Sequence, residues 1–166
     1  MVERKIVIEN MNIAYKGLFN IDEYFRLIDN WLRSKSYIKH EWRNSESVEA
    51  TGKTIEIVNM PYKKITDYAK YIIQIQTEMD QVVETTIEKD GIKKNMNKGK
   101  IEVTLNGYLE LDYEHRWEKK PSFYFLRTIF DQFIFKVHTD KFEQGLVEEV
   151  QHLHSFIKSH LNLYKY

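Results

Sequence analysis

The chain of 166 residues carries 25 basic and 25 acidic side chains, and 42% of its residues are hydrophobic. This balance is typical of a globular domain and lacks the overall positive field of a dedicated nucleic-acid binder. The absence of cysteine excludes disulfides, thiol nucleophiles and zinc–thiolate sites. There is no apolar run of about 18 residues and no signal peptide, so we expect one cytoplasmic domain over residues 1–166.

The N-terminal part of the chain predicts a strand followed by a helix. Apolar and polar residues alternate over Lys5–Tyr15, which is typical of a strand. Asn20 is placed as a helix N-cap, since its side chain can accept a hydrogen bond from the backbone N–H of Glu23. Apolar residues then recur with helical spacing to about Ser34, which indicates an amphipathic helix.

Two further strands are expected next. Tyr37–Val48 alternates and places Trp42 on one face of a strand. Gly52 marks a turn, and Thr54–Met60 predicts the following strand. Pro61 cannot donate a hydrogen bond to a neighbouring strand, so it indicates an end or an edge there.

The strongest pattern consists of two long alternating stretches, Tyr71–Glu88 and Lys100–Trp117. Because side chains alternate across a strand, each stretch predicts one long strand with an apolar and a polar face. Folding the chain back around residues 89–99 would bring Val83 beside Leu105. At ~3.3 Å per residue these strands approach ~60 Å, so we expect them to curve around a core.

Gly107 interrupts the second long stretch. In the predicted pairing it lies opposite Gln81, where a bulge would help the sheet to bend. A tight hairpin at Asn106–Gly107 is the alternative. That hairpin would set Val103 against Glu110 and mix the two faces, so we reject it.

After Pro121 the apolar spacing becomes helical. Phe123–Val137 predicts one helix, and Asp140 is spaced with Glu143 as a capping box that starts another. The last helix carries a single apolar stripe, formed by Phe142, Leu146, Val150, Leu153, Ile157, Leu161 and Tyr164.

The predicted order is a strand, a helix, about five antiparallel strands of which two are long, and a C-terminal helix. It resembles the helix-grip fold of the START-related and pollen-allergen-related superfamily, which includes polyketide cyclases. The resemblance implies an α+β domain in which a curved antiparallel sheet grips the C-terminal helix, often around a hydrophobic ligand. The helix over residues 123–137 is additional to that pattern, and only one helix lies between the first two strands. Because members range from lipid carriers to enzymes, the fold alone does not choose a function.

A ligand cavity is expected on the concave face of the sheet, opposite the helices. The alternative is that the same side chains pack as a solid core. His115 would need a hydrogen-bond partner there, which a tyrosine hydroxyl or His40 could supply. The candidate ligand-binding residues are Trp42, Tyr71, Ile73, Ile75, Tyr113, His115, Trp117, Phe130 and Leu153.

Two other segments are candidate contact surfaces. The lysines of the predicted loop over residues 89–100, among them Lys93, Lys94 and Lys98, could contact an anionic surface, or they could be a solvated turn. The aromatic helix Phe123–Val137 could dock a partner or a second copy, or be buried beneath the last helix.

Neither the acidic nor the histidine pairs predict a metal site, and we expect no cofactor. Glu110, Asp112 and Glu114 are placed on the outward, wet face of their strand. His152 and His154 are two residues apart, so on a helix they point in nearly opposite directions.

These observations favour a non-catalytic binding protein with a hydrophobic cavity for a lipid-like or aromatic small molecule. One alternative is a cyclase-type enzyme in which His115 acts as acid and base and Tyr113 or Tyr71 polarises a carbonyl. Another is an interaction protein that docks through residues 123–137.

Overall fold

The computed structural model describes residues 2–111 and 136–162. No helix within these ranges is long and apolar enough to cross a membrane. In chain order the elements are β1 (Glu3–Phe19), α1 (Ile21–Ser34), β2 (Glu41–Glu49), β3 (Gly52–Asn59), β4 (Tyr62–Lys64), β5 (Ala69–Lys89), β6 (Ile92–Leu111) and α3 (Lys136–Asn162).

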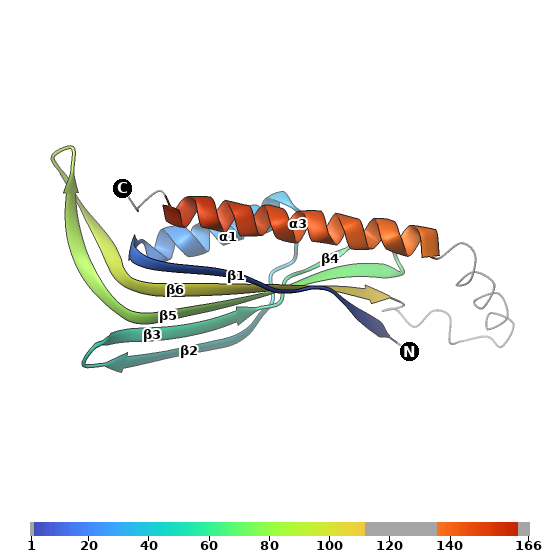
Figure 1. Cartoon of the computed structure of the whole chain (residues 1–166), viewed down its shortest axis with the longest axis horizontal. Helices are drawn as coiled ribbons and strands as arrows, with labels where there is room; N and C mark the ends of the chain where they lie inside the picture. The colour runs from blue at the N-terminus through green and yellow to red at the C-terminus, as the bar shows by residue number, and fades with distance from the viewer. Residues whose placement is uncertain (1, 112–135, 163–166) are drawn as a thin grey trace, which may run out of the picture.

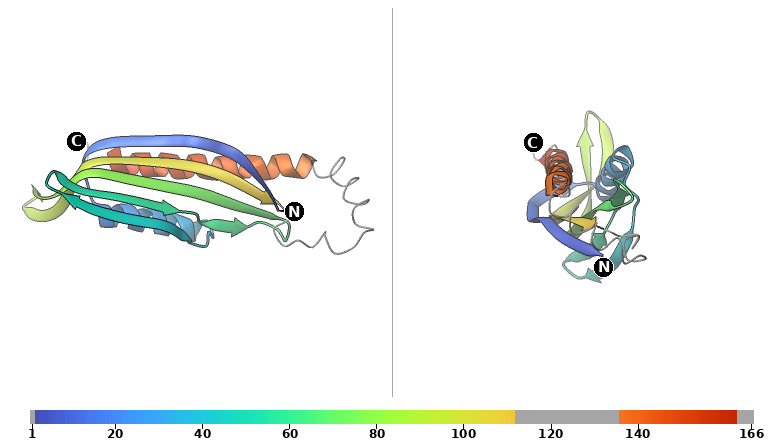
Figure 2. Two further views of the ribbon diagram at one scale, coloured as in Figure 1. Left: turned by 90° about the horizontal axis from the view of Figure 1, so that it is seen from below. Right: turned by 90° about the vertical axis from the view of Figure 1, so that its right-hand side faces the viewer.

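The strands form one open antiparallel sheet in the order β1-β6-β5-β3-β2, with the short β4 also paired to β5. Figure 1 and Figure 2 show that the sheet is curved and that α1 and α3 lie on the same side of it. We call the helix side the concave face and the opposite side the convex face. The structure confirms the predicted class, an α+β fold whose curved antiparallel sheet carries a C-terminal helix.

The core lies between the concave face and the helices. The predicted stripe of α3 is confirmed from Leu146 to Leu161, because Leu146, Val150, Leu153 and Ile157 have no exposed surface and Leu161 has 1%. Phe142 is partly buried against the same core, and Tyr164 lies outside the described residues. Ile73, Ile75, Leu105 and Leu109 of β5 and β6 belong to the same buried cluster. A Cβ atom added to Gly107 would lie only 2.7 Å from Cγ2 of Ile8 and 3.2 Å from Cγ2 of Val150, so this glycine lets α3 come close to the sheet.

The start of α3 differs from the prediction. The helix begins at Lys136, and Asp140 lies within it rather than at its N-cap. A polar residue such as Asp140 on an exposed helix surface costs only about 0.5 kcal/mol relative to alanine, which the packing of the stripe outweighs. The predicted helix over residues 123–137 lies outside the described residues, except for its last two, which begin α3.

The pairing of β5 with β6 is antiparallel, as predicted, but its register is different. The chain turns within two residues, Asp90–Gly91, whose φ angles of 53° and 75° suit a type I′ hairpin, rather than through a loop over residues 89–99. Leu105 therefore pairs with Ile75, and Val83 pairs with Lys98. Leu105 is displaced along β5 by eight residues, an even number, so the apolar faces are assigned correctly as far as Met79. Farther along β5 the prediction was wrong, because Val82 is buried and Val83 is 46% exposed.

The far end of this hairpin, residues 83–98, bends toward the helix side of the sheet (Figure 1); we call it the hairpin arm. The bend coincides with a register shift between Asp80 and Val83, where Gln81 has a φ of 53°. A Cβ at Gly99 would lie 2.9 Å from the backbone oxygen of Asp80, so the strands approach closely at the bend. The bulge was expected at Gly107, opposite Gln81, but Gly107 pairs with Ile73 and the bulge between β5 and β6 lies at Gln81 itself. No turn occurs at Asn106–Gly107.

The N-terminal elements follow the sequence closely. Oδ1 of Asn20 accepts a hydrogen bond of 2.9 Å from the backbone N–H of Glu23, which confirms the predicted cap of α1. The strand β2 begins at Glu41 rather than at residue 37, because the Tyr37 side chain is buried in the core and Ile38 forms an isolated bridge to Tyr62.

Candidate functional site

Four of the predicted cavity residues are brought together under the helices. Tyr71, Ile73, Ile75 and Leu153 belong to one core cluster, and none is more than 5% exposed. Side chains of α3 and of the sheet therefore fill the space around these four residues. The other predicted members Tyr113, His115, Trp117 and Phe130 lie outside the described residues.

Trp42 does not join that cluster, which corrects the prediction. Its side chain is 66% exposed and lines a hollow with His40 and Tyr62. The cause is an irregularity in β2, where Glu41 pairs with Asn59 but Arg43 pairs with Val58. Trp42 is the extra residue at this bulge, and a bulge changes the face onto which a strand directs its side chains.

A charged and aromatic cluster holds the middle of α3 to the sheet. Glu149 accepts a hydrogen bond of 2.5 Å from the Tyr37 hydroxyl and forms an ion pair with Lys63. The Lys63 ammonium lies 4.8 Å from the ring centroid of Tyr37 and 5.7 Å from that of Tyr71.

Tyr71 of this cluster keeps its proton at neutral pH. Burial, together with the charges of Glu149 and Glu148, raises the pKa of Tyr71 to about 12. Its hydroxyl oxygen would lie 2.6 Å from a Cβ atom on Gly145, so it packs against the backbone of α3. Within the described part of the chain, Tyr71 therefore anchors a helix.

His152 and His154 of α3 contact different elements, as their spacing predicted. Nδ1 of His152 accepts a hydrogen bond of 2.7 Å from Nε1 of Trp31 in α1. Nε2 of His154 lies 3.1 Å from the backbone oxygen of Asn12 in β1. The residues that the structure describes contain no group of three side chains that could hold a metal ion.

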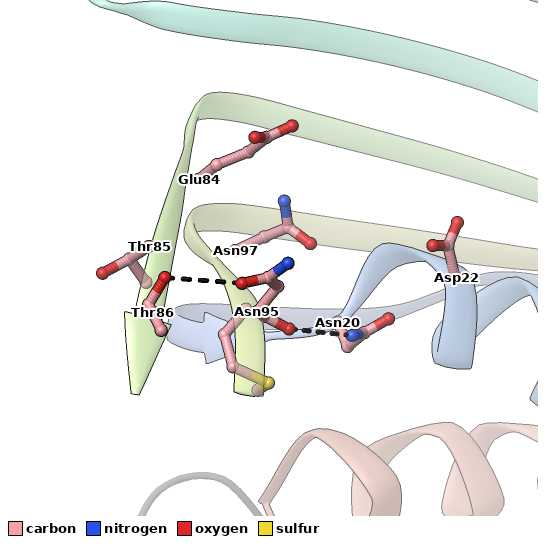
Figure 3. A pocket seen from close by; sticks show the side chains of 8 residues that line it. Asn20, Asp22, Glu84, Thr85, Thr86, Asn95 and Asn97 are labelled. Atoms are coloured by element: carbon pink, nitrogen blue, oxygen red, sulfur yellow. Dashed lines mark hydrogen bonds between the residues drawn. The ribbon is translucent and has the colours of Figure 1, made fainter. Parts of the chain in front are cut away.

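An open cleft lies beside α1, between this helix, the β2–β3 strands and the hairpin arm; we call it the α1 cleft. It consists of two hollows of about 310 and 340 Å³ that share Asp22, Glu84 and Asn97 in their linings. The first has an apolar floor, formed by Ile21 and Phe25 of α1, Ile55 and Ile57 of β3, and Val82 of β5. The second is polar, and Figure 3 shows its side chains Asn20, Asp22, Glu84, Thr85, Thr86, Asn95 and Asn97.

Contacts at the start of α1 hold the arm in place. The backbone N–H of Ile21 donates to Oδ1 of Asn97 at 3.2 Å, and Nδ2 of Asn20 donates to the backbone oxygen of Asn95 at 3.3 Å. Lys94 of the arm pairs with Glu23 at 2.8 Å. These contacts join segments about 75 residues apart in sequence and make the arm one wall of the cleft.

The rim of the α1 cleft is acidic. Asp22, Glu46 and Glu84 contribute three carboxylates, and the one lysine of the lining, Lys53, is paired with Glu46 at 2.8 Å. An excess of carboxylates repels anions and attracts cations. The cleft is thus suited to an apolar molecule that is neutral or carries a positive group.

Sequence reasoning missed this cleft. Asn95 and Asn97 were placed in a lysine-rich loop, whereas they belong to β6 and face the cap of α1. The Asp90–Gly91 turn was the available signal, since Asp-Gly between two strands favours a two-residue hairpin. With that turn, 92–99 becomes a strand and its side chains reach α1.

One further site prediction was wrong. Glu110 was expected on a wet strand face, but it is 6% exposed and pairs with both Arg4 and Lys70. Cations from the two neighbouring strands cover its carboxylate. Asp112 and Glu114 lie outside the described residues.

The comparisons with known proteins do not add to this geometry. No protein-family model, no curated protein and no solved structure matches the chain. The candidate site is therefore identified by its own residues, an apolar floor joined to a polar, acidic end.

Proposed function

We propose that this protein is a non-catalytic binding protein of the helix-grip type, and that its ligand is a small, largely apolar molecule held in the α1 cleft. The order of strands and helices, with both helices on the concave face, supports the helix-grip relationship. The acidic rim favours a ligand whose polar end is neutral or cationic.

The observation that carries this proposal is the apolar floor that remains open. Phe25, Ile21 and Ile57 are only partly buried, and they line the hollow of about 310 Å³. At about 25 cal/mol per Å² of apolar surface removed from water, burying ~200 Å² of the ligand's own apolar surface would contribute about 5 kcal/mol to binding. The partly buried side chains beside α1 support a ligand site there rather than under α3, where buried side chains pack together as the core.

Titration with N-phenyl-1-naphthylamine, a neutral dye that fluoresces in apolar surroundings, tests the proposal. We expect saturable, stoichiometric binding and a higher melting temperature in the presence of the dye. Ile57→Glu should weaken binding at least ~10-fold, because a charge would enter the apolar floor. Phe25→Ala removes an aromatic side chain from the α1 wall of the cleft, and it should also weaken binding of the dye.

Val48→Glu is the matched control, because Val48 is 75% exposed on the neighbouring strand β2 and does not line the cleft. It should bind the dye like the original chain. Circular dichroism checks that each variant is folded. If the original chain does not bind the dye, the proposal is contradicted. It is also contradicted if Ile57→Glu and Phe25→Ala bind the dye as tightly as the original chain does.

A further inference from the structure

The two hollows of the α1 cleft differ in chemistry and meet at shared residues. We call the hollow of about 310 Å³, which has the apolar floor, the apolar hollow, and the hollow of about 340 Å³ the polar hollow. Asp22, Glu84 and Asn97 line both hollows. Small-molecule sites measure about 300–1,000 Å³, so each hollow can hold one part of a ligand. A ligand that fills both therefore has an apolar part and a polar part, joined beside these three residues.

Hydrogen-bond acceptors line the polar hollow from two sides. Asp22 belongs to α1 and Glu84 to the hairpin arm, and both side chains are exposed. Among the residues that the structure describes, neither carboxylate has a hydrogen bond or an ion pair. The charge of Glu84 acts on Lys53, but Lys53 itself is paired with Glu46. The oxygens of both carboxylates are thus open to a ligand in the cleft.

A hydrogen-bond donor lies beside these acceptors. Oδ1 of Asn97 accepts from the backbone N–H of Ile21, which fixes the side-chain amide. Its Nδ2 group has no partner within residues 2–111 and 136–162. Asn97 pairs with Glu84 across the arm, and directly opposed residues of antiparallel strands carry their side chains on the same face (Figure 3). An amide donor and a carboxylate acceptor therefore stand side by side in the polar hollow.

This pairing of donor and acceptor matches a hydroxyl group, because a hydroxyl both donates and accepts hydrogen bonds. An ammonium group only donates, so it would leave the Nδ2 group of Asn97 without an acceptor. A carboxylate or phosphate group only accepts, and the charges of Asp22 and Glu84 would repel it. Several neighbouring hydroxyls on one head group satisfy the amide and both carboxylates together.

We propose that the ligand of the α1 cleft is an uncharged amphiphile with a polyhydroxylated head group, such as an alkyl glycoside. This inference rests on the proposed function, since it names the head group of the ligand that the apolar floor holds. The alkyl chain lies in the apolar hollow, over Phe25 and Ile57. Hydroxyls of the head group donate to Asp22 and Glu84 and accept from Nδ2 of Asn97.

Three compounds that share an octyl chain and differ in their head groups provide the test. They are n-octyl β-D-glucopyranoside, octylamine, which is cationic at neutral pH, and octyl sulfate, which is anionic. Isothermal titration calorimetry below the micellar concentration measures each affinity without the use of a dye. We expect the glucoside to bind ~5-fold more tightly than octylamine and ~10-fold more tightly than octyl sulfate.

Two variants test the assigned head-group contacts. Glu84→Gln replaces an ionised acceptor that has no partner in the described part of the fold, and it should weaken binding of the glucoside ~5-fold. Asn97→Asp keeps an oxygen for the N–H of Ile21 but removes the Nδ2 donor. It should weaken binding of the glucoside ~5-fold and strengthen binding of octylamine ~3-fold, because it exchanges a donor for a charged acceptor.

Glu88→Gln is the matched control, because Glu88 is exposed on the same arm and lines neither hollow. It should bind all three compounds like the original chain. Octylamine that binds more tightly than the glucoside, or a glucoside affinity that is unchanged in Glu84→Gln and Asn97→Asp, would overturn the head-group assignment. If Ile57→Glu still weakens binding of the neutral dye, the proposed function survives that result. Failure of the original chain to bind the dye or any octyl compound would contradict both.

Discussion

Glu110 illustrates how single residues acquire their properties from the fold. Burial acts to raise the pKa of its carboxyl, but the hydrogen bonds and charges of Lys70 and Arg4 outweigh burial and lower it. Arg4 and Glu110 are 106 residues apart in sequence and become neighbours because β1 pairs with β6. The sequence pattern of neither segment, taken by itself, indicates this contact.

Glu110→Gln should reduce the free energy of unfolding at pH 7 by about 1–2 kcal/mol, because it removes a carboxylate that two cations share. The pKa of Glu110 is lower in the folded than in the unfolded chain, where its ordinary value is 4.5. Its stabilisation is therefore complete above pH 4.5 and is lost as the pH falls through the folded-state pKa. Urea unfolding at pH 7 and at pH 3 measures both effects.

Glu102→Gln is the control on the same strand, because Glu102 is more exposed and pairs with Asn12 and Lys100. We expect Glu102→Gln to lose less free energy of unfolding than Glu110→Gln. Equal stability of Glu110→Gln and the original chain at pH 7 would contradict the assigned role of Glu110.

At the scale of elements, the hairpin arm forms one wall of the α1 cleft and supplies most of the polar side chains of its polar hollow. The arm depends on a two-residue turn at one end and on the bulge at Gln81 at the other. The turn sets the register, and the bulge directs the arm toward α1. Both features need residues with a positive φ, which explains why a glycine stands in the turn.

Gly91→Ala should destabilise the protein by about 1 kcal/mol, because alanine is strained at a φ of 75°. A Cβ at Gly91 would meet nothing within 4 Å among the described residues, so backbone conformation is the cause. Gly91→Asn should lose less, since asparagine tolerates this conformation better than alanine. Thermal unfolding of both variants measures the difference, and an equal loss for the two would argue against a type I′ turn.

At the scale of the whole molecule, the two faces of the sheet differ in what covers them. The concave face is covered by α3 over β1, β5 and β6, and it is only partly covered by α1 over β3, which leaves the α1 cleft. The convex face carries the charged cluster around Glu110 and the hollow beside Trp42. The stability of the sheet depends on its central strands, since β5 pairs with both β3 and β6.

Ile75→Asp should unfold the whole domain. Ile75 has no exposed surface and lies between Asn59 of β3 and Leu105 of β6, so the aspartate would be a buried charge. Such burial costs several kcal/mol, comparable to the stability of a domain of this size. Val48→Asp, at an exposed position of β2, should remain folded. Far-ultraviolet circular dichroism and melting temperature distinguish the two, and a normal melting temperature for Ile75→Asp would contradict this packing.

The sequence by itself determined the fold class, the cap and length of α1, the apolar stripe of α3 and the faces of the long strands as far as the bulge at Gln81. These are local or periodic properties, and period-two alternation assigns a side chain to a face whatever its partner strand. Tertiary structure alone decided the register of β5 with β6, the displacement of Trp42 by a bulge and the pairing of Glu110 with Arg4 and Lys70. An even shift in register keeps every apolar face intact, so alternation could not choose between the pairings. The α1 cleft joins residues of α1 with those of distant strands, and the hollow beside Trp42 joins residues of β1, β2, β4 and β5, so both depend on how the strands pair.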